Sequence, residues 1–178
     1  MQAEQSGASE ATVKTDDGVE FGAPEPAEGA DMWRVARDSG GLELNTLYAY
    51  LLLSHHFQKT CCVARFEGEV VGYVGAYLIP ARPDTVFVWQ IGVDAKMRGR
   101  GLGKRLLHAL VELEGCKDVH FLETTVTPDN TASRRLFAAF AREQGCPIVE
   151  KEGFPASIFK FEQHEAEDLF RIGPFGEG

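Results

Sequence analysis

Two stretches of the chain repeat apolar residues at the spacing of an amphipathic helix. Residues 101–114 carry one apolar face, made by Leu102, Leu106, Leu110 and Leu113. Residues 43–57 carry another, made by Leu44, Leu47, Tyr48, Leu51 and Leu52. The spacing therefore predicts a helix in each stretch. A third helix is predicted over residues 130–144, because Pro128 and Asp129 interrupt the preceding apolar run.

Shorter apolar and β-branched runs lie between these helices and predict strands. Residues 61–66 and 70–79 flank a polar turn and form a predicted hairpin. Residues 85–93 are almost continuously apolar, which is typical of a central strand that is buried on both faces. The remaining predicted strands cover residues 32–37, 119–127, 148–151 and 157–161. Paired strands followed by alternating strands and helices indicate an α/β layer fold.

Residues 1–30 have a different composition, rich in Glu, Ala, Gly and Pro and poor in large apolar side chains. Such a segment buries too little surface to offset the entropy that is lost on ordering, so we expect a disordered acidic tail. Residues 31–178 are expected to form one domain, which suits a chain of 178 residues.

The formal net charge of -9 narrows the choice of partners. An acidic protein is repelled by nucleic acid and by anionic membranes, so neither is an expected partner, whereas a cationic substrate suits it. The four cysteines form no C-x-x-C pair, so we expect neither a metal site nor a disulfide framework. The chain shows neither a signal peptide nor an apolar run of about 18 residues. These features favour a cytoplasmic protein with reduced thiols.

A glycine-rich loop follows the central predicted strand and leads directly into the helix over residues 101–114. Gly99, Gly101 and Gly103 allow the backbone to approach a ligand closely, with N–H groups pointing at it. The start of the helix adds the positive end of its dipole. Three positive side chains stand in the same loop, namely Arg98, Arg100 and Lys104. Together they predict a binding site for a pyrophosphate group.

Three other interpretations of this loop are weaker. A P-loop requires Ser or Thr after its lysine, but Lys104 is followed by Arg105. A dinucleotide-binding loop requires G-x-G-x-x-G after the first strand, which differs from this spacing and position. A simple tight turn with a glycine cap explains the glycines but not the positive charges.

The pattern Arg98-x-x-Gly101-x-Gly103 resembles the coenzyme A pyrophosphate signature of the GNAT family of N-acetyltransferases. The resemblance implies a single-domain α/β fold with helices on both faces of a mixed central sheet. That sheet is splayed between the fourth and fifth predicted strands, residues 85–93 and 119–127. Acetyl-CoA is the implied co-substrate, without a metal. The cofactor-binding residues that follow are Ile91, Gly92, Val93, Arg98, Gly99, Arg100, Gly101, Gly103, Lys104 and Asn130.

Four separated blocks are similar to one particular branch of that family. They cover residues 42–53, 82–90, 122–128 and 164–175. Members of the branch acetylate the γ-amine of L-2,4-diaminobutyrate during the synthesis of the compatible solute ectoine. The resemblance implies the same reaction for this chain, and a homodimer.

Such a reaction requires a group that takes a proton from the substrate ammonium, whose pKa is about 10. It also requires donors for the tetrahedral oxyanion and support for the departing thiolate. The acid–base candidates in the sequence are Glu43, Glu123, His164 and Glu167. His164 and Glu167 are three residues apart, so on a helix they would share a face.

The resemblance implies that His164 and Glu167 are catalytic. It places Glu43, Tyr48, Trp89 and Glu123 among the substrate-binding residues. Without the resemblance, residues 164–167 also fit a solvated polar turn, Glu43 fits a helix start, and Trp89 fits the core.

One position departs from the family pattern. Many members have a tyrosine seven residues after the asparagine, where it protonates the thiolate, but here that position is Phe137. A water molecule, Tyr77 or departure of the thiolate without direct help are the open alternatives.

Three rival functions share the same cofactor loop. They are acetylation of another amine, a coenzyme A sensor without catalysis, and a regulatory partner without turnover. The carboxylates around the expected acceptor favour turnover.

Overall fold

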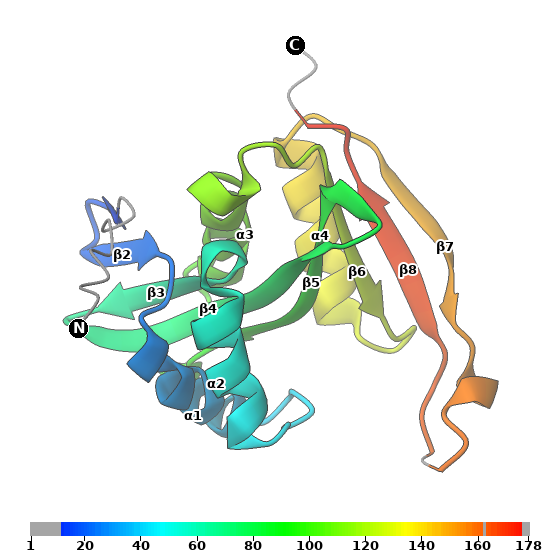
Figure 1. The fold of residues 1–178 in the computed structure, drawn as a ribbon, viewed down its shortest axis with the longest axis horizontal. Helices are drawn as coiled ribbons and strands as arrows, with labels where there is room; N and C mark the ends of the chain where they lie inside the picture. Colours follow the sequence, from blue (N-terminus) through cyan, green and yellow to red (C-terminus); the bar gives the residue numbers. More distant parts are fainter. Residues whose placement is uncertain (1–11, 162, 176–178) are drawn as a thin grey trace, which may run out of the picture.

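One mixed sheet runs through the computed structural model, which describes residues 12–161 and 163–175 (Figure 1). Its strand order is β1-β2-β3-β4-β5-β6-β8-β7, and only β5 and β6 are parallel neighbours. The strands are β1 (Val13–Lys14), β2 (Val19–Gly22), β3 (Cys62–Phe66), β4 (Glu69–Ile79), β5 (Arg82–Val93), β6 (Phe121–Val126), β7 (Ile148–Phe154) and β8 (Glu167–Ile172).

The parallel pair is short. Residues 85–88 of β5 pair with residues 121–124 of β6, and beyond this point the two strands separate. β5 stays paired with β4 as far as Val93, whereas the end of β6 pairs with β8. Figure 1 shows the two halves of the sheet, β1 to β5 and β6 to β7, on either side of this junction. The predicted splay between these strands is therefore confirmed.

Helices cover both faces of the sheet, as predicted. They are α1 (Gly29–Ser39), α2 (Leu47–His56), α3 (Leu102–Val111) and α4 (Thr131–Glu143). Strand alternation divides the core between the two faces. Val63 and Tyr73 pack with α1 and α2, whereas Val74 packs in the cluster that contains the apolar faces of α3 and α4.

Two neighbouring cysteines follow the same alternation. Cys61 belongs to the cluster of α1 and α2, and Cys62 belongs to the cluster of α3 and α4. Burial raises the pKa of each thiol to about 12. Both residues therefore act as small apolar core residues. None of the helices in the described ranges is long and apolar enough to cross a membrane.

The predicted disordered tail over residues 1–30 is wrong for its described part, residues 12–30. β2 pairs with β3, and its side chains Val19 and Phe21 are 0% and 4% exposed. Arg105 lies over the Phe21 ring at 5.0 Å. A strand of only four residues carries too few apolar positions to stand out from its glycine- and proline-rich surroundings. Residues 1–11 lie outside the described residues.

Residues 32–37, predicted as a strand, belong to α1 instead. Met32, Val35 and Ala36 are buried at the i, i+3, i+4 spacing of a helix. The helix ends at Gly40, which adopts a φ of 67°. A run of six residues is too short to distinguish the apolar spacing of a helix from that of a strand.

The C-terminal region also differs from the prediction. Residues 157–161 form no strand, because Ala156–Ile158 is a 3-10 turn. β8 lies instead at Glu167–Ile172, between β6 and β7. The helices predicted over residues 43–57, 101–114 and 130–144 are confirmed, with shorter bounds. So are the hairpin of β3 and β4 and the strands β5 and β6.

Phe21→Ala should lower the free energy of unfolding by about 3–5 kcal/mol, because it leaves a cavity in a packed core. Urea denaturation followed by circular dichroism measures this change. The control Val13→Ala, at a side chain that is 58% exposed, should change stability by less than about 0.5 kcal/mol. An unchanged stability for Phe21→Ala would contradict the packing of β2 on the domain.

Candidate active site

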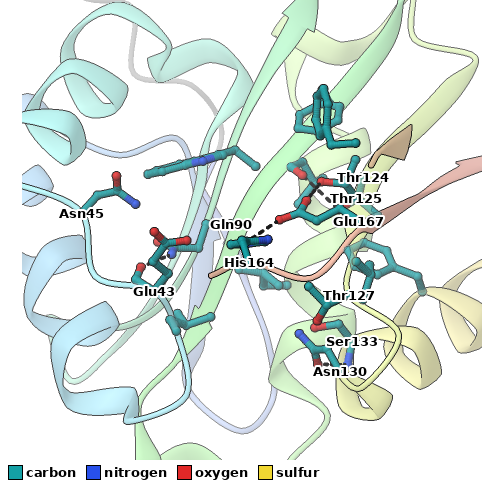
Figure 2. A pocket seen from close by; sticks show the side chains of 18 of the residues that line it. Glu43, Asn45, Gln90, Thr124, Thr125, Thr127, Asn130, Ser133, His164 and Glu167 are labelled. Atoms are coloured by element: carbon teal, nitrogen blue, oxygen red, sulfur yellow. Dashed lines mark hydrogen bonds and ion pairs between the residues drawn. The ribbon is translucent and has the colours of Figure 1, made fainter. Parts of the chain in front are cut away.

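A cavity of about 510 Å³ lies where β5 and β6 separate. Its size falls within the range of small-molecule sites. The wall combines the loop before α2, the outer half of β5, the end of β6, the start of α4 and the segment before β8 (Figure 2). Polar wall residues are Glu43, Asn45, Gln90, Thr124, Thr125, Thr127, Asn130, Ser133, His164 and Glu167.

One wall of the cavity is a partly open strand edge. Because β6 departs after residue 88 of β5, backbone groups of residues 89–93 on that side lack a neighbouring strand. Ile91 lines the cavity there. Gly92 is required by packing, since an added Cβ would lie 2.6 Å from Cε1 of Tyr73. The edge can donate hydrogen bonds to an extended ligand.

The glycine-rich loop forms the start of α3, as the sequence predicted. Gly101 has a φ of 66°, and its carbonyl accepts the first full-turn bond, from the Arg105 N–H at 3.1 Å. The N–H groups of residues 102–104 precede that turn and lack helical partners. Within the described chain no side chain caps this end. Such a terminus is suited to an anion.

The positive residues of the loop are partly engaged by the protein itself. Arg98 donates to the backbone carbonyl of Ser39, and Lys104 pairs with Glu143 at 2.6 Å. Arg100 is exposed. Of the predicted cofactor residues, Ile91 and Asn130 line the cavity, whereas Gly92, Val93, Arg98, Gly99, Arg100, Gly101, Gly103 and Lys104 are outside its wall. Their contact with the coenzyme stays a prediction.

Asn130 begins α4 at the cavity wall. Its Oδ1 accepts a hydrogen bond from the Ser133 N–H at 3.0 Å, which makes it the N-cap. Phe137, about two turns further along α4, is buried and also lines the cavity. A phenyl ring cannot donate a proton. Tyr77 lies in the wall as well, so it is available as the alternative donor.

His164 and Glu167 lie together in the wall, but not on a helix. Residues 163–166 form neither helix nor strand, and His164 Nε2 lies 3.5 Å from Glu167 Oε1 (Figure 2). Thr125 donates its hydroxyl to Oε2 of Glu167. The predicted proximity is confirmed, whereas the helical reason for it is wrong.

A backbone carbonyl determines which ring nitrogen of His164 carries a proton. Its Nδ1 lies 2.7 Å from the carbonyl of Glu165, which can only accept a hydrogen bond. Nδ1 therefore carries a proton, and Nε2 either holds a lone pair or shares a proton with Glu167. The Phe159 ring stacks on the imidazole at 4.1 Å between centroids. This arrangement resembles a proton acceptor oriented by its neighbours.

Further carboxyl groups stand next to wall residues in the sequence, although they are outside the wall itself. Asp129, just before Asn130, hydrogen-bonds to Glu165 and raises the pKa of the Glu165 carboxyl. Glu43 lines the opposite wall. A site with several carboxylates attracts a cationic ligand.

The structure separates the other predicted substrate residues. Trp89 lines the cavity, 37% exposed, with its ring 5.9 Å from that of Tyr50. Tyr48 is 68% exposed on α2 and is not in the wall.

Glu123 is the clearest correction. Its side chain is 3% exposed and stands between two guanidinium groups, outside the cavity wall. Arg82 binds both of its oxygens, at 2.6 and 2.7 Å, and Arg171 binds Oε1 at 2.5 Å. These bonds, those from Arg82 foremost, lower the pKa of the carboxyl. A carboxylate held in this way is a structural anchor and a poor base.

Sequence reasoning missed Gln90, Thr125 and Phe159. Gln90 had a signal, because it is a polar residue inside the apolar run of the central strand. Thr125 had none, since it bonds to Glu167, which is distant in the sequence. Phe159 had none either, because nothing in the sequence shows that its ring stacks on that of His164.

A splayed sheet with an open strand edge, an uncapped helix start beside it and an oriented acid–base pair defines an acyl-transferring enzyme. Residues 29–141 match the model of a protein family described as "Acetyltransferase (GNAT) family". The chain belongs to the GNAT acetyltransferase family.

Individual relatives are similar over nearly the whole chain. The chain is 44% identical to L-2,4-diaminobutyric acid acetyltransferase of Marinococcus halophilus over 159 residues, 89% of this chain and 92% of that protein. It is 45% identical to the enzyme of the same name from Bordetella parapertussis over 153 residues, 85% of this chain and 82% of that protein.

Solved structures agree on the fold. Diaminobutyrate acetyltransferase of Paenibacillus lautus, in complex with its substrate L-2,4-diaminobutyric acid and coenzyme A, is 42% identical with a TM-score of 0.84. The match covers 90% of this chain and 97% of that one. The ribosomal-protein-S18-alanine N-acetyltransferase of Escherichia coli is 15% identical, with a TM-score of 0.65 over 90% of this chain and 96% of that one. This second likeness concerns the fold alone. The predicted GNAT-like α/β fold is confirmed.

Gly101→Val should weaken coenzyme A binding by about tenfold or more, while the protein stays folded. A β-branched residue resists a φ of 66°, and its side chain would stand where the pyrophosphate approaches. Titration calorimetry with coenzyme A measures the affinity.

Gly145→Val is the matched control, because Gly145 has the same φ of 66°. An added Cβ would meet no atom of the described chain within 4 Å at either glycine. Both variants should lose similar stability, about 1–3 kcal/mol, but Gly145→Val should bind coenzyme A normally. Equal affinity of the two variants would mean that the loop is only a turn.

Proposed function

We propose that this chain transfers the acetyl group of acetyl-CoA to the γ-amine of L-2,4-diaminobutyrate, giving Nγ-acetyl-diaminobutyrate for ectoine synthesis. The observation that carries the proposal is the pair His164 and Glu167 facing Glu43 across the cavity at the sheet junction. The high identity to diaminobutyrate acetyltransferases over nearly the whole chain supports the same substrate.

Acetyl-CoA would lie along the open edge of β5. We propose that N–H groups near residues 91–93 hold the pantetheine arm and stabilise the oxyanion, as a strand edge can. The start of α3 would hold the pyrophosphate, with Arg98, Arg100 and Lys104 supplying charge. Asn130 would contact the coenzyme from the other side of the opening. The geometry that supports this is the unpaired edge beside an uncapped helix.

The acceptor brings two ammonium groups and a carboxylate. A γ-ammonium beside Glu167 and His164 can pass a proton to this pair, and the free amine then attacks the thioester carbonyl carbon. The attack forms the C–N bond, and the C–S bond breaks when the tetrahedral intermediate collapses. The coenzyme leaves as a thiolate, and the attacking nitrogen gives up its second proton, which balances the proton that the thiolate takes up. Glu43 and Trp89 would hold the rest of the diamino acid. Water and Tyr77 remain the alternatives for protonating the thiolate, because Phe137 has no proton to give.

We also propose a cytoplasmic homodimer. The exposed apolar residues Ile148, Val149 and Phe154 on edge strand β7 support contact with a second copy. Light scattering of the purified protein tests the dimer.

Acetylation is expected on the γ-amine, and 2,3-diaminopropionate should be a much poorer substrate. The α-ammonium and carboxylate act as handles that place the far amine at the thioester, so removing one methylene misplaces the nucleophile. Thiol release gives the rates, and proton NMR of the product locates the acetyl group. An α-acetylated product would overturn the proposed orientation.

Glu167→Gln should lower kcat/KM for diaminobutyrate by about a hundred- to ten-thousand-fold while acetyl-CoA affinity changes little. Glutamine keeps the size and loses the charge that holds or deprotonates the ammonium. Residual activity should rise with pH, because free amine becomes available without a base. Initial rates between about pH 7 and pH 10 test this.

Glu112→Gln, at an exposed residue outside the cavity wall, is the control and should behave like the wild type. His164→Ala should show a smaller loss in the same direction as Glu167→Gln. Wild-type kinetics for Glu167→Gln at neutral pH would remove Glu167 from the reaction and leave Glu43 as the carboxylate to test.

A further inference from the structure

Gln90 makes three hydrogen bonds that connect the core to the cavity wall. Its Oε1 lies 2.8 Å from the hydroxyl of Tyr50 and 2.5 Å from the hydroxyl of Tyr73. Its Nε2 lies 2.8 Å from the backbone carbonyl of Glu43. One amide on β5 therefore links two core tyrosines to the loop before α2.

Chemistry fixes the orientation of this amide. The carbonyl of Glu43 can only accept a hydrogen bond, so the nitrogen of Gln90 must face it. Both tyrosine hydroxyls then donate to Oε1. Burial, and to a lesser extent Tyr50, raise the pKa of Tyr73, so this hydroxyl keeps its proton.

The two tyrosines are rigid supports. Tyr50 on α2 and Tyr73 on β4 are both 0% exposed, and their rings meet edge to face at 6.0 Å. They belong to the core cluster under α1 and α2. Gln90 is thus held from the side of the core, and its nitrogen has one direction in which to donate.

The loop that Gln90 holds contributes Gly41, Leu42, Glu43 and Asn45 to the cavity wall. A second donor, Nε1 of Trp33, binds the Asn45 carbonyl at 3.2 Å. The loop is therefore fastened at two peptide carbonyls by side chains from α1 and β5. Figure 2 shows Glu43 and Gln90 on one side of His164, with Glu167 on the other.

We propose that Gln90 is a positioning residue for the acceptor: by fastening the Glu43 peptide it fixes the Glu43 carboxylate opposite His164 and Glu167. The inference rests on the proposed function, since it assigns Glu43 to the diamino acid. An amide is required at residue 90 because it accepts from the tyrosines and donates to the carbonyl. A carboxylate can do only the first.

Gln90→Glu tests the proposal through the difference between its effects on the two substrates. A glutamate carboxyl is ionised at neutral pH and above, so it would set an oxygen against the Glu43 carbonyl and release the loop. At about pH 8 we expect kcat/KM for diaminobutyrate to fall about tenfold or more, with KM for acetyl-CoA unchanged.

Two further variants separate positioning from packing. Gln90→Met keeps the volume and removes the donor without adding a charge, so it should lower kcat/KM for diaminobutyrate by less than Gln90→Glu does. Gln58→Glu is the matched control, because Nε2 of Gln58 also donates to a backbone carbonyl, that of Pro24, at 2.7 Å. It lies outside the cavity wall and should leave both KM values unchanged.

Tryptophan fluorescence reports on the loop without turnover. The chain has two tryptophans, Trp33 bound to the Asn45 carbonyl and Trp89 beside Gln90. The emission of Gln90→Glu should differ from that of the wild type at about pH 8, where the carboxylate is ionised. Gln58→Glu should show no such change.

Equal losses for both substrates in Gln90→Glu would overturn positioning in favour of general packing. Unchanged kinetics would overturn it as well. If the wild type releases no thiol in the presence of any diamino acid, the proposed function fails. The fluorescence comparison then still decides whether Gln90 holds the loop.

Discussion

The short pairing between β5 and β6 is the constraint on which the rest of the structure depends. Four residues from each strand pair, and then β6 turns to β8 while β5 stays with β4. If the pairing continued, the edge of β5 would be used by the sheet and no cavity could open there. The separation leaves backbone donors available at the cavity wall, where we propose that they stabilise the developing oxyanion.

A buried ionic cluster stands directly at this junction. Glu123 on β6 is bound by Arg82 at the start of β5 and by Arg171 on β8, so one carboxylate joins three strands. Removing both arginines would leave the buried Glu123 carboxylate uncompensated, which is far costlier than the loss of an exposed pair. The cluster therefore stabilises the paired end of the strands, and the open end is free to bind ligands. The sequence suggested chemistry for Glu123, but its surroundings give it this structural role.

Long periodic elements and the glycine-rich loop were predictable, because their signals are local. The apolar face of α3 and the continuous run of β5 were correctly identified from spacing alone. β2 and α1 were not, since each rests on a few side chains whose burial depends on distant strands. The sequence predicted that His164 and Glu167 lie close together, but for the wrong reason. They meet without a helix, and Thr125 on β6 fixes Glu167 by a hydrogen bond. Gln90 could be identified only once its partners on α2, β4 and the loop were known.

The proposed sites of the two substrates differ in whether their residues lie within the match to the GNAT family. The match to the GNAT family covers residues 29–141, which include the open edge of β5 and the start of α3. His164, Glu167 and the stacked Phe159 lie beyond that range, yet they line the side of the cavity that we propose for the acceptor. β8 brings them there, because it inserts between β6 and β7, and it follows the residues that match the family model. Specificity can therefore change through this C-terminal segment while the thioester end of the cavity is kept, provided that β8 remains in register with β6.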